Sequence, residues 1–83
     1  MMNESNALQL ADQTILQLRR NNYIRAVWLV GNDVRRTPAS DTDITAMLGN
    51  GARLVGIFTP AVDRAYLRDA IMETAQEGAN SGV

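Results

Sequence analysis

Three aspartates, Asp33, Asp41 and Asp43, follow an apolar run within the segment LVGNDVRRTPASDTDITAML, residues 29–48. Their carboxylate oxygens could converge on a magnesium ion and support phosphoryl or nucleotidyl transfer. Each aspartate also suits a local structural role, Asp33 in a turn and the other two in the first turn of a helix. These local roles explain all three residues, so we predict no metal site, no cofactor and no enzymatic activity. A metal-dependent or degenerate enzyme that uses the three aspartates is the alternative hypothesis.

Arg35 and Arg36 lie between these aspartates. All eight basic residues of the chain are arginines, which bind carboxylates and phosphates in a bidentate manner. However, the aspartates at the neighbouring helix start would repel a phosphate, and the segment has no glycine-rich phosphate cradle. The net charge of −1 also argues against nucleic acid as the ligand. We therefore expect these arginines to contact a protein, with nucleic-acid binding as a second alternative.

The chain lacks residue types on which much of enzyme chemistry depends. It contains neither cysteine nor histidine, which excludes disulfides, thiolate chemistry and the usual general base near neutral pH. Without histidine or lysine, no base is available to activate a serine nucleophile. No apolar run approaches the roughly 20 residues of a membrane span, and we see no signal-peptide pattern. We therefore expect a cytoplasmic protein.

Part of the segment is similar to the GS…DxD signature of minimal nucleotidyltransferases, through Gly31 followed by Asp43. The downstream stretch RLVGIFTPAVDRAYLRDAI is similar to the closing strand and helix of that family. The serine of the signature is replaced by Asn32, and the second and third carboxylate positions hold Thr45 and Gly56. Because two of the three carboxylates are missing, the resemblance does not imply two-metal nucleotidyl transfer, and we do not assign the family.

Apolar residues at helical spacing predict three helices, over residues 4–21, 40–49 and 60–77. Ser40 is expected to cap the second helix, and Gly49 to end it in a left-handed conformation. Thr59 is expected to cap the third, with Pro60 at its first position. The core stripe of the first helix is expected to be Leu8, Ala11, Ile15 and Leu18. That of the third is expected to be Leu67, Ala70, Ile71, Thr74 and Ala75.

Two apolar segments, 23–31 and 52–59, predict two buried strands. Residues 26–30 are continuously apolar, which indicates a strand covered on both faces and favours a parallel sheet. Trp28 is interpreted as a core residue rather than a ligand platform. Because a helix joins the two strands, we expect them to be parallel with a right-handed crossover. The residues between Gly31 and the second helix are interpreted as a polar connection.

The expected architecture is a single α/β domain that spans residues 1–83. Its order is helix, strand, helix, strand, helix, with a two-stranded parallel sheet that dimerisation could extend. The tails at 1–4 and 78–83 are expected to fray. An alternative is an α+β fold in which residues 44–48 form a third strand.

Apolar residues outside the core stripes predict an interface with another protein. The candidate partner-binding residues are Leu10, Arg35, Arg36, Val62, Ala65 and Met72. A chain of this size is marginally stable alone, so we also expect a homodimer. We therefore predict a small non-enzymatic protein-binding module of the regulator, adaptor or inhibitor type. Small bacterial or phage accessory proteins often have this profile.

Overall fold

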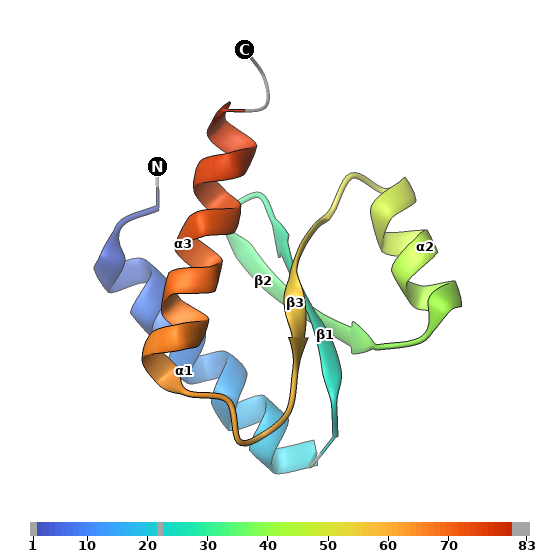
Figure 1. The fold of residues 1–83 in the computed structure, drawn as a ribbon, viewed down its shortest axis with the longest axis horizontal. Helices are drawn as coiled ribbons and strands as arrows, with labels where there is room; N and C mark the ends of the chain where they lie inside the picture. The colour runs from blue at the N-terminus through green and yellow to red at the C-terminus, as the bar shows by residue number, and fades with distance from the viewer. Residues whose placement is uncertain (1, 22, 81–83) are drawn as a thin grey trace.

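A computed structural model describes residues 2–21 and 23–80 of the chain. The elements in chain order are α1 (Glu4–Asn21), β1 (Arg25–Val30), β2 (Asp33–Pro38), α2 (Asp41–Gly49), β3 (Arg53–Phe58) and α3 (Arg64–Asn80). They form three layers, with α1 and α3 on one face of the sheet and the short α2 on the other (Figure 1). The radius of gyration is 12.1 Å, close to the roughly 12 Å of a compact domain of this length, which supports a single domain.

The sheet has three strands in the order β2–β1–β3, and both neighbouring pairs are antiparallel. Our prediction of a two-stranded parallel sheet is therefore wrong. The polar residues that we expected to form a connection make β2, which pairs with β1 through a two-residue hairpin turn at Gly31 and Asn32. Gly31 has a φ of 63°, a conformation that this kind of turn requires and that glycine adopts without strain.

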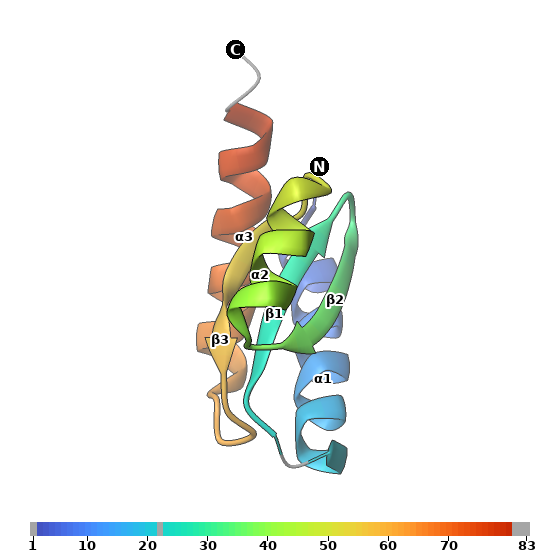
Figure 2. The ribbon, with the colours of Figure 1, turned by 90° about the vertical axis from the view of Figure 1, so that its right-hand side faces the viewer.

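Two strands joined by a helix do run parallel in this fold, but they are β2 and β3 rather than the pair that we predicted. Both β2 and β3 are antiparallel to β1, so they point the same way on its two sides, and α2 joins them across the face of the sheet (Figure 2). The alternative that residues 44–48 form a third strand is also wrong, because these residues lie within α2.

The core has two parts, one on each face of β1. Toward α1 and α3, Val27 joins a cluster with Ala7, Ala11, Ile15, Leu18, Phe58, Leu67 and Ile71. Toward α2, Ala26 and Trp28 join Ala52, and the half-buried Ile44 and Met47 of α2 pack against them. Trp28 is fully buried, as we predicted, and its indole N–H donates to Oγ1 of Thr37 at 2.9 Å. The central strand is therefore covered on both faces although the sheet is antiparallel.

The long helices follow the predicted apolar stripes closely. In α1, Ala11, Ile15 and Leu18 are buried as expected, while Leu8 is only half-buried. In α3, Leu67, Ile71 and Thr74 are buried, while Ala70 and Ala75 are half-buried. Two surface ion pairs also join the helices, Arg64 Nε with Asp12 at 2.6 Å and Arg68 Nη1 with Glu4 at 3.3 Å. Exposed pairs of this kind stabilise little, so the apolar seam holds the two helices together.

The ends of α2 are only partly as predicted. Ser40 is the N-cap, because its Oγ accepts a hydrogen bond from the backbone N–H of Asp43 at 3.2 Å. Gly49 does not adopt the left-handed conformation that we expected. The helix continues through it to a C-cap at Asn50, and Gly51 has the positive φ of 81°. The chain thus reverses two residues later than predicted.

The start of α3 also differs from the prediction. Thr59 and Pro60 begin a turn rather than the helix, with the N–H of Val62 donating to the carbonyl of Thr59 at 3.1 Å. Asp63 caps the helix instead, since its Oδ2 accepts from the N–H of Tyr66 at 3.0 Å. At the other end α3 extends through residues 78–80, which we expected to fray, while 81–83 lie outside the described residues.

Candidate functional site

The three aspartates of the metal hypothesis lie on two elements. Asp33 is the first residue of β2, opposite Val30 at the hairpin end, while Asp41 and Asp43 lie in the first turn of α2. The hydroxyl of Ser40 donates to the Asp43 carboxylate, so that side chain closes the cap. Within residues 2–21 and 23–80, no group of three acidic, histidine or cysteine side chains could hold a metal ion. The geometry thus gives Asp43 a structural role at the helix start.

Arg35 and Arg36 lie in strand β2 rather than in the loop that we predicted. Arg35 is opposite Trp28 and therefore projects toward the α2 face, whereas Arg36 is opposite Val27 and projects toward the α1 face. Both side chains are exposed. Because the two side chains project from opposite faces of the sheet, they cannot bind the same anion together.

The apolar candidates do not form one surface. Leu10, Val62 and Met72 are half-buried and pack against the main core cluster, while Ala65 is exposed on α3. Val62 lies before α3 rather than on it, which explains why a helical projection misplaced it. Most of the apolar surface that we assigned to a partner is therefore used inside the domain, and the role of these residues in partner binding stays a prediction.

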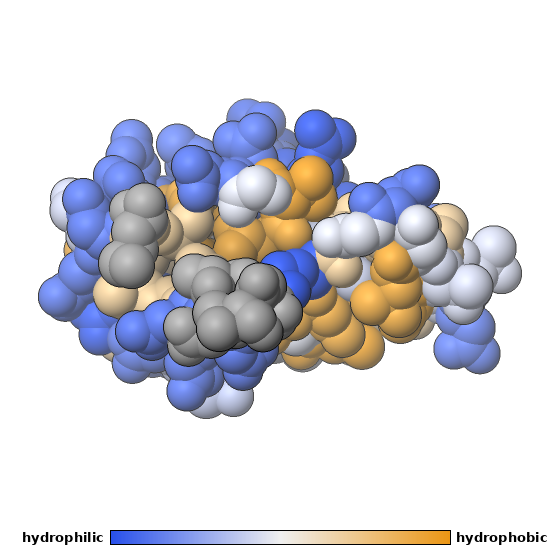
Figure 3. Space-filling model, turned by 90° about the horizontal axis from the view of Figure 1, so that it is seen from above, coloured by the Kyte–Doolittle hydropathy of each residue, from blue (hydrophilic) through white to orange (hydrophobic). Residues whose placement is uncertain are grey.

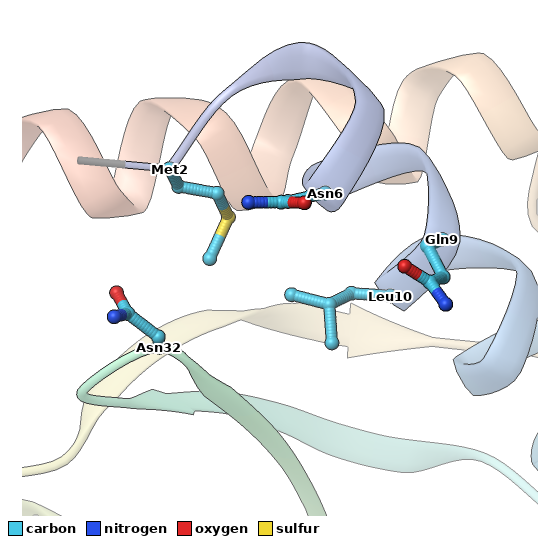
Figure 4. A pocket seen from close by; sticks show the side chains of 5 residues that line it. All are labelled: Met2, Asn6, Gln9, Leu10 and Asn32. Carbon is cyan, nitrogen blue, oxygen red and sulfur yellow. The ribbon is translucent and has the colours of Figure 1, made fainter.

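Leu10 also lines a pocket between α1 and the β1–β2 hairpin (Figure 4). Its other lining residues are Met2, Asn6, Gln9 and Asn32. The pocket has a volume of about 190 Å³ and presents amide groups but no charged side chain. Pockets for drug-sized ligands measure roughly 300–1,000 Å³, so this one is too small to be a convincing ligand site.

Strand β3 presents a more open apolar surface. Leu54 is 40% exposed and Ile57 is 51% exposed, although both belong to a strand that we predicted to be buried. Leu54 is opposite Trp28 and Ile57 is opposite Ala26, so both project toward the α2 face. The short α2 does not cover them, and Figure 3 shows hydrophobic surface where the sheet and α2 meet. We refer to Leu54 and Ile57 as the β3 apolar pair.

A groove of about 360 Å³ runs between β3 and α3. The two elements lie side by side in both ribbon views (Figures 1 and 2). The strand side of the groove is formed by the five consecutive residues 54–58, and the helix side by Tyr66, Ala70, Glu73, Thr74 and Glu77. We refer to this feature as the β3–α3 groove. Because every residue of a strand segment lines it, the groove follows the edge of the strand.

The floor of this groove depends on a close approach of Phe58 to Gly56. A Cβ atom built on Gly56 would lie 2.8 Å from Cζ of the Phe58 ring, nearer than ordinary van der Waals contact. The ring in turn meets Tyr66 of α3 edge to face, with centroids 6.3 Å apart. Gly56 therefore leaves the space that lets Phe58 bridge the strand and the helix.

Edge geometry distinguishes β3 further. The pairing with β1 shifts register between Val27 and Trp28, which are opposite Gly56 and Leu54, so Val55 is the extra residue of a β-bulge. No strand among the described residues pairs with the other side of β3. The outer backbone groups of β3 thus border the groove without a strand partner.

Our sequence reasoning missed this site because it treated β3 as a covered strand. A signal was present, since Gly-Asn between two short strand-like runs is a recognised hairpin sequence. With a hairpin at Gly31 and Asn32, β1 takes the central position and β3 becomes an edge.

The structure contains no helix, over the residues described, that is long and apolar enough to cross a membrane. No family model matches the chain, and neither the curated proteins nor the solved structures with which it was compared include a match. The site is therefore interpreted from its own geometry.

Proposed function

We propose that this chain is a small non-enzymatic protein-binding module whose binding surface is centred on strand β3. The observation that carries the proposal is an edge strand with two half-exposed apolar side chains, Leu54 and Ile57, on one face. Exposed apolar edges invite pairing, and proteins that do not use them usually shield them with charges or with a covering element. A role as regulator, adaptor or inhibitor fits a surface of this kind.

The test is capture of binding proteins from a lysate of the source cells by the immobilised chain. We expect Leu54→Asp and Ile57→Asp to reduce recovery of the captured protein at least about tenfold, because a charge on an apolar contact must be desolvated. Leu16→Asp is the matched control, since Leu16 is 64% exposed on α1, away from β3. Circular dichroism should show that all three variants fold. Equal recovery by the wild type and both β3 variants would contradict the proposal.

A further inference from the structure

We infer that the β3–α3 groove binds an extended segment of the partner protein as an added strand, and that this segment carries basic side chains toward Glu73 and Glu77. The inference rests on the proposed protein-binding function and specifies its ligand. It follows from the open edge of β3, the dimensions of the groove and the charge of its helical wall.

The edge of β3 offers main-chain hydrogen bonds to a fourth strand. β3 pairs with β1 on one side only, and no other described strand covers its outer side. Addition of a peptide to such an edge is a common mode of recognition, in which the backbone supplies affinity and alternate side chains supply specificity. Because α3 forms the other wall of the groove, an added strand would also pack against this helix.

The two walls of the groove have matching lengths. Residues 54–58 of β3 extend over about 13 Å at 3.3 Å for each residue step. The helical wall from Tyr66 to Glu77 extends over about 16 Å at 1.5 Å for each residue step. A segment of about five residues in extended conformation therefore fits along both walls.

The helical wall carries two carboxylates, Glu73 and Glu77, for which the described part of the chain shows no ion pair. Glu73 and Glu77 are one turn apart on α3, an arrangement in which like charges destabilise a helix. By contrast Glu4, Asp12 and Asp69 each form an ion pair with an arginine. None of the ion pairs found between described residues includes Glu73 or Glu77. A basic side chain in the groove would remove the repulsion between these two carboxylates.

A second copy of this chain fits the groove less well. Two β3 strands paired about a two-fold axis perpendicular to the sheet would place both α3 helices on one face, across the axis from each other. Glu73, near the middle of each helical wall, would then approach Glu73 of the other copy, and like charges disfavour such contact. The bulge at Val55 also bends the edge, which hinders a rigid strand more than a flexible segment.

The geometry also specifies the pattern of the segment. Side chains of an added strand alternate between the two faces of the sheet. Those on the α3 side meet Glu73 and Glu77, and those on the α2 side meet the β3 apolar pair, Leu54 and Ile57. The preferred ligand is therefore an extended segment that alternates basic and apolar residues.

The test measures fluorescence anisotropy of labelled peptides, with blocked ends, on the full chain. One peptide alternates valine with arginine, and the other alternates valine with glutamate. We expect the arginine peptide to bind and the glutamate peptide not to bind. The double variant Glu73→Gln/Glu77→Gln should weaken binding of the arginine peptide about fivefold or more. The double variant Glu73→Arg/Glu77→Arg should reverse the preference between the two peptides.

The matched control is Asp33→Asn/Asp41→Asn, which removes the same charge from positions outside the groove. It should leave binding of the arginine peptide unchanged, and equal weakening by both double variants would show non-specific attraction and overturn the inference. Hydrogen exchange of residues 54–58 should slow when the arginine peptide binds. Unchanged exchange there would overturn strand addition even if the peptide binds.

Two further outcomes separate this inference from the proposed function. If lysate capture depends on Leu54 and Ile57 while the arginine peptide does not bind, the protein-binding function stands and the basic ligand is refuted. If sedimentation shows a dimer that Leu54→Asp and Ile57→Asp abolish and that excess arginine peptide does not dissociate, the groove is occupied by a second copy and the inference is overturned.

Discussion

Gly56 offers a sharp test of how β3 is packed, because the residue that replaces it must compete with the Phe58 ring. In Gly56→Ala the new Cβ would lie 2.8 Å from Cζ of Phe58, so the ring must move by about half an ångström to restore ordinary contact. Phe58 is only 8% exposed and meets both the core cluster and Tyr66, so its displacement strains packed neighbours.

The size of the effect follows from two opposing terms. Overpacking of a buried site costs about 1–3 kcal/mol. Replacing glycine within a strand by alanine regains about 0.5–1 kcal/mol, because alanine loses less conformational freedom on folding. We therefore expect Gly56→Ala to lower the free energy of unfolding by up to about 2.5 kcal/mol, and by about 1 kcal/mol at the middle of the two ranges. In a Phe58→Leu background, which lacks Cζ and both Cε atoms, the same change should be neutral or stabilising.

Urea denaturation of the four proteins in this double-mutant cycle measures both numbers, with fluorescence of Trp28, the single tryptophan, as the signal. A coupling energy of at least about 0.5 kcal/mol between the two positions is expected. If Gly56→Ala stabilises the wild type, or has the same effect in both backgrounds, the ring does not occupy the space above Gly56 and our account of the groove floor is wrong.

Three other predictions concern contacts elsewhere in the fold. Ser40→Ala should lower the free energy of unfolding by about 1 kcal/mol in urea denaturation, because it removes the N-cap of α2. Thr37→Val should cost about 1–3 kcal/mol in the same assay, because the buried indole N–H of Trp28 loses its acceptor, while Thr37→Ser should cost much less. The hydrogen bond from Arg64, aided by its charge, lowers the pKa of Asp12, so Arg64→Gln should raise that pKa toward the ordinary value in a carboxyl NMR titration. Because the pKa of Asp12 is lower in the folded protein than in the unfolded chain, the ionised carboxylate stabilises the fold when the pH is above the ordinary pKa of aspartate. This stabilisation is lost as the pH falls through the lowered pKa. The wild type should therefore lose this contribution to stability in acid, whereas Arg64→Gln has no such contribution to lose.

The helical half of the fold could be predicted because its signals are local. In α1, apolar residues at helical spacing identify the buried stripe, and only Leu8 differs. Ser40 caps α2 as its place before an acidic turn indicates. The helix ends were less predictable, since Thr59 and Asp63 are both good caps and four residues apart. Thr59 instead takes part in the turn that follows β3, and this leaves Asp63 as the residue that caps α3.

The sheet could not be predicted because strand pairing is not local. The strand β2 has the sequence DVRRTP, in which only Val34 and Thr37 are half-buried, so its apolar pattern is too weak to indicate a strand. The continuous burial of β1 was identified correctly but attributed to a parallel sheet, whereas helices on both faces and antiparallel neighbours produce the same pattern. The candidate site was missed for the same reason, because the exposure of Leu54 and Ile57 depends on which strand is central.

The two edges of this sheet differ in a way that limits how far it can grow. The β2 edge ends in Pro38, which has no backbone N–H to donate, and carries the exposed side chains of Arg35 and Arg36. The β3 strand contains no proline, and its one charged residue, Arg53, is half-buried. If β3 is the binding edge, as we propose, a strand is added on that side, and the proline and the arginines of β2 disfavour a second addition on the other side. Association through this sheet should stop at a discrete complex of fixed stoichiometry instead of continuing into a fibre.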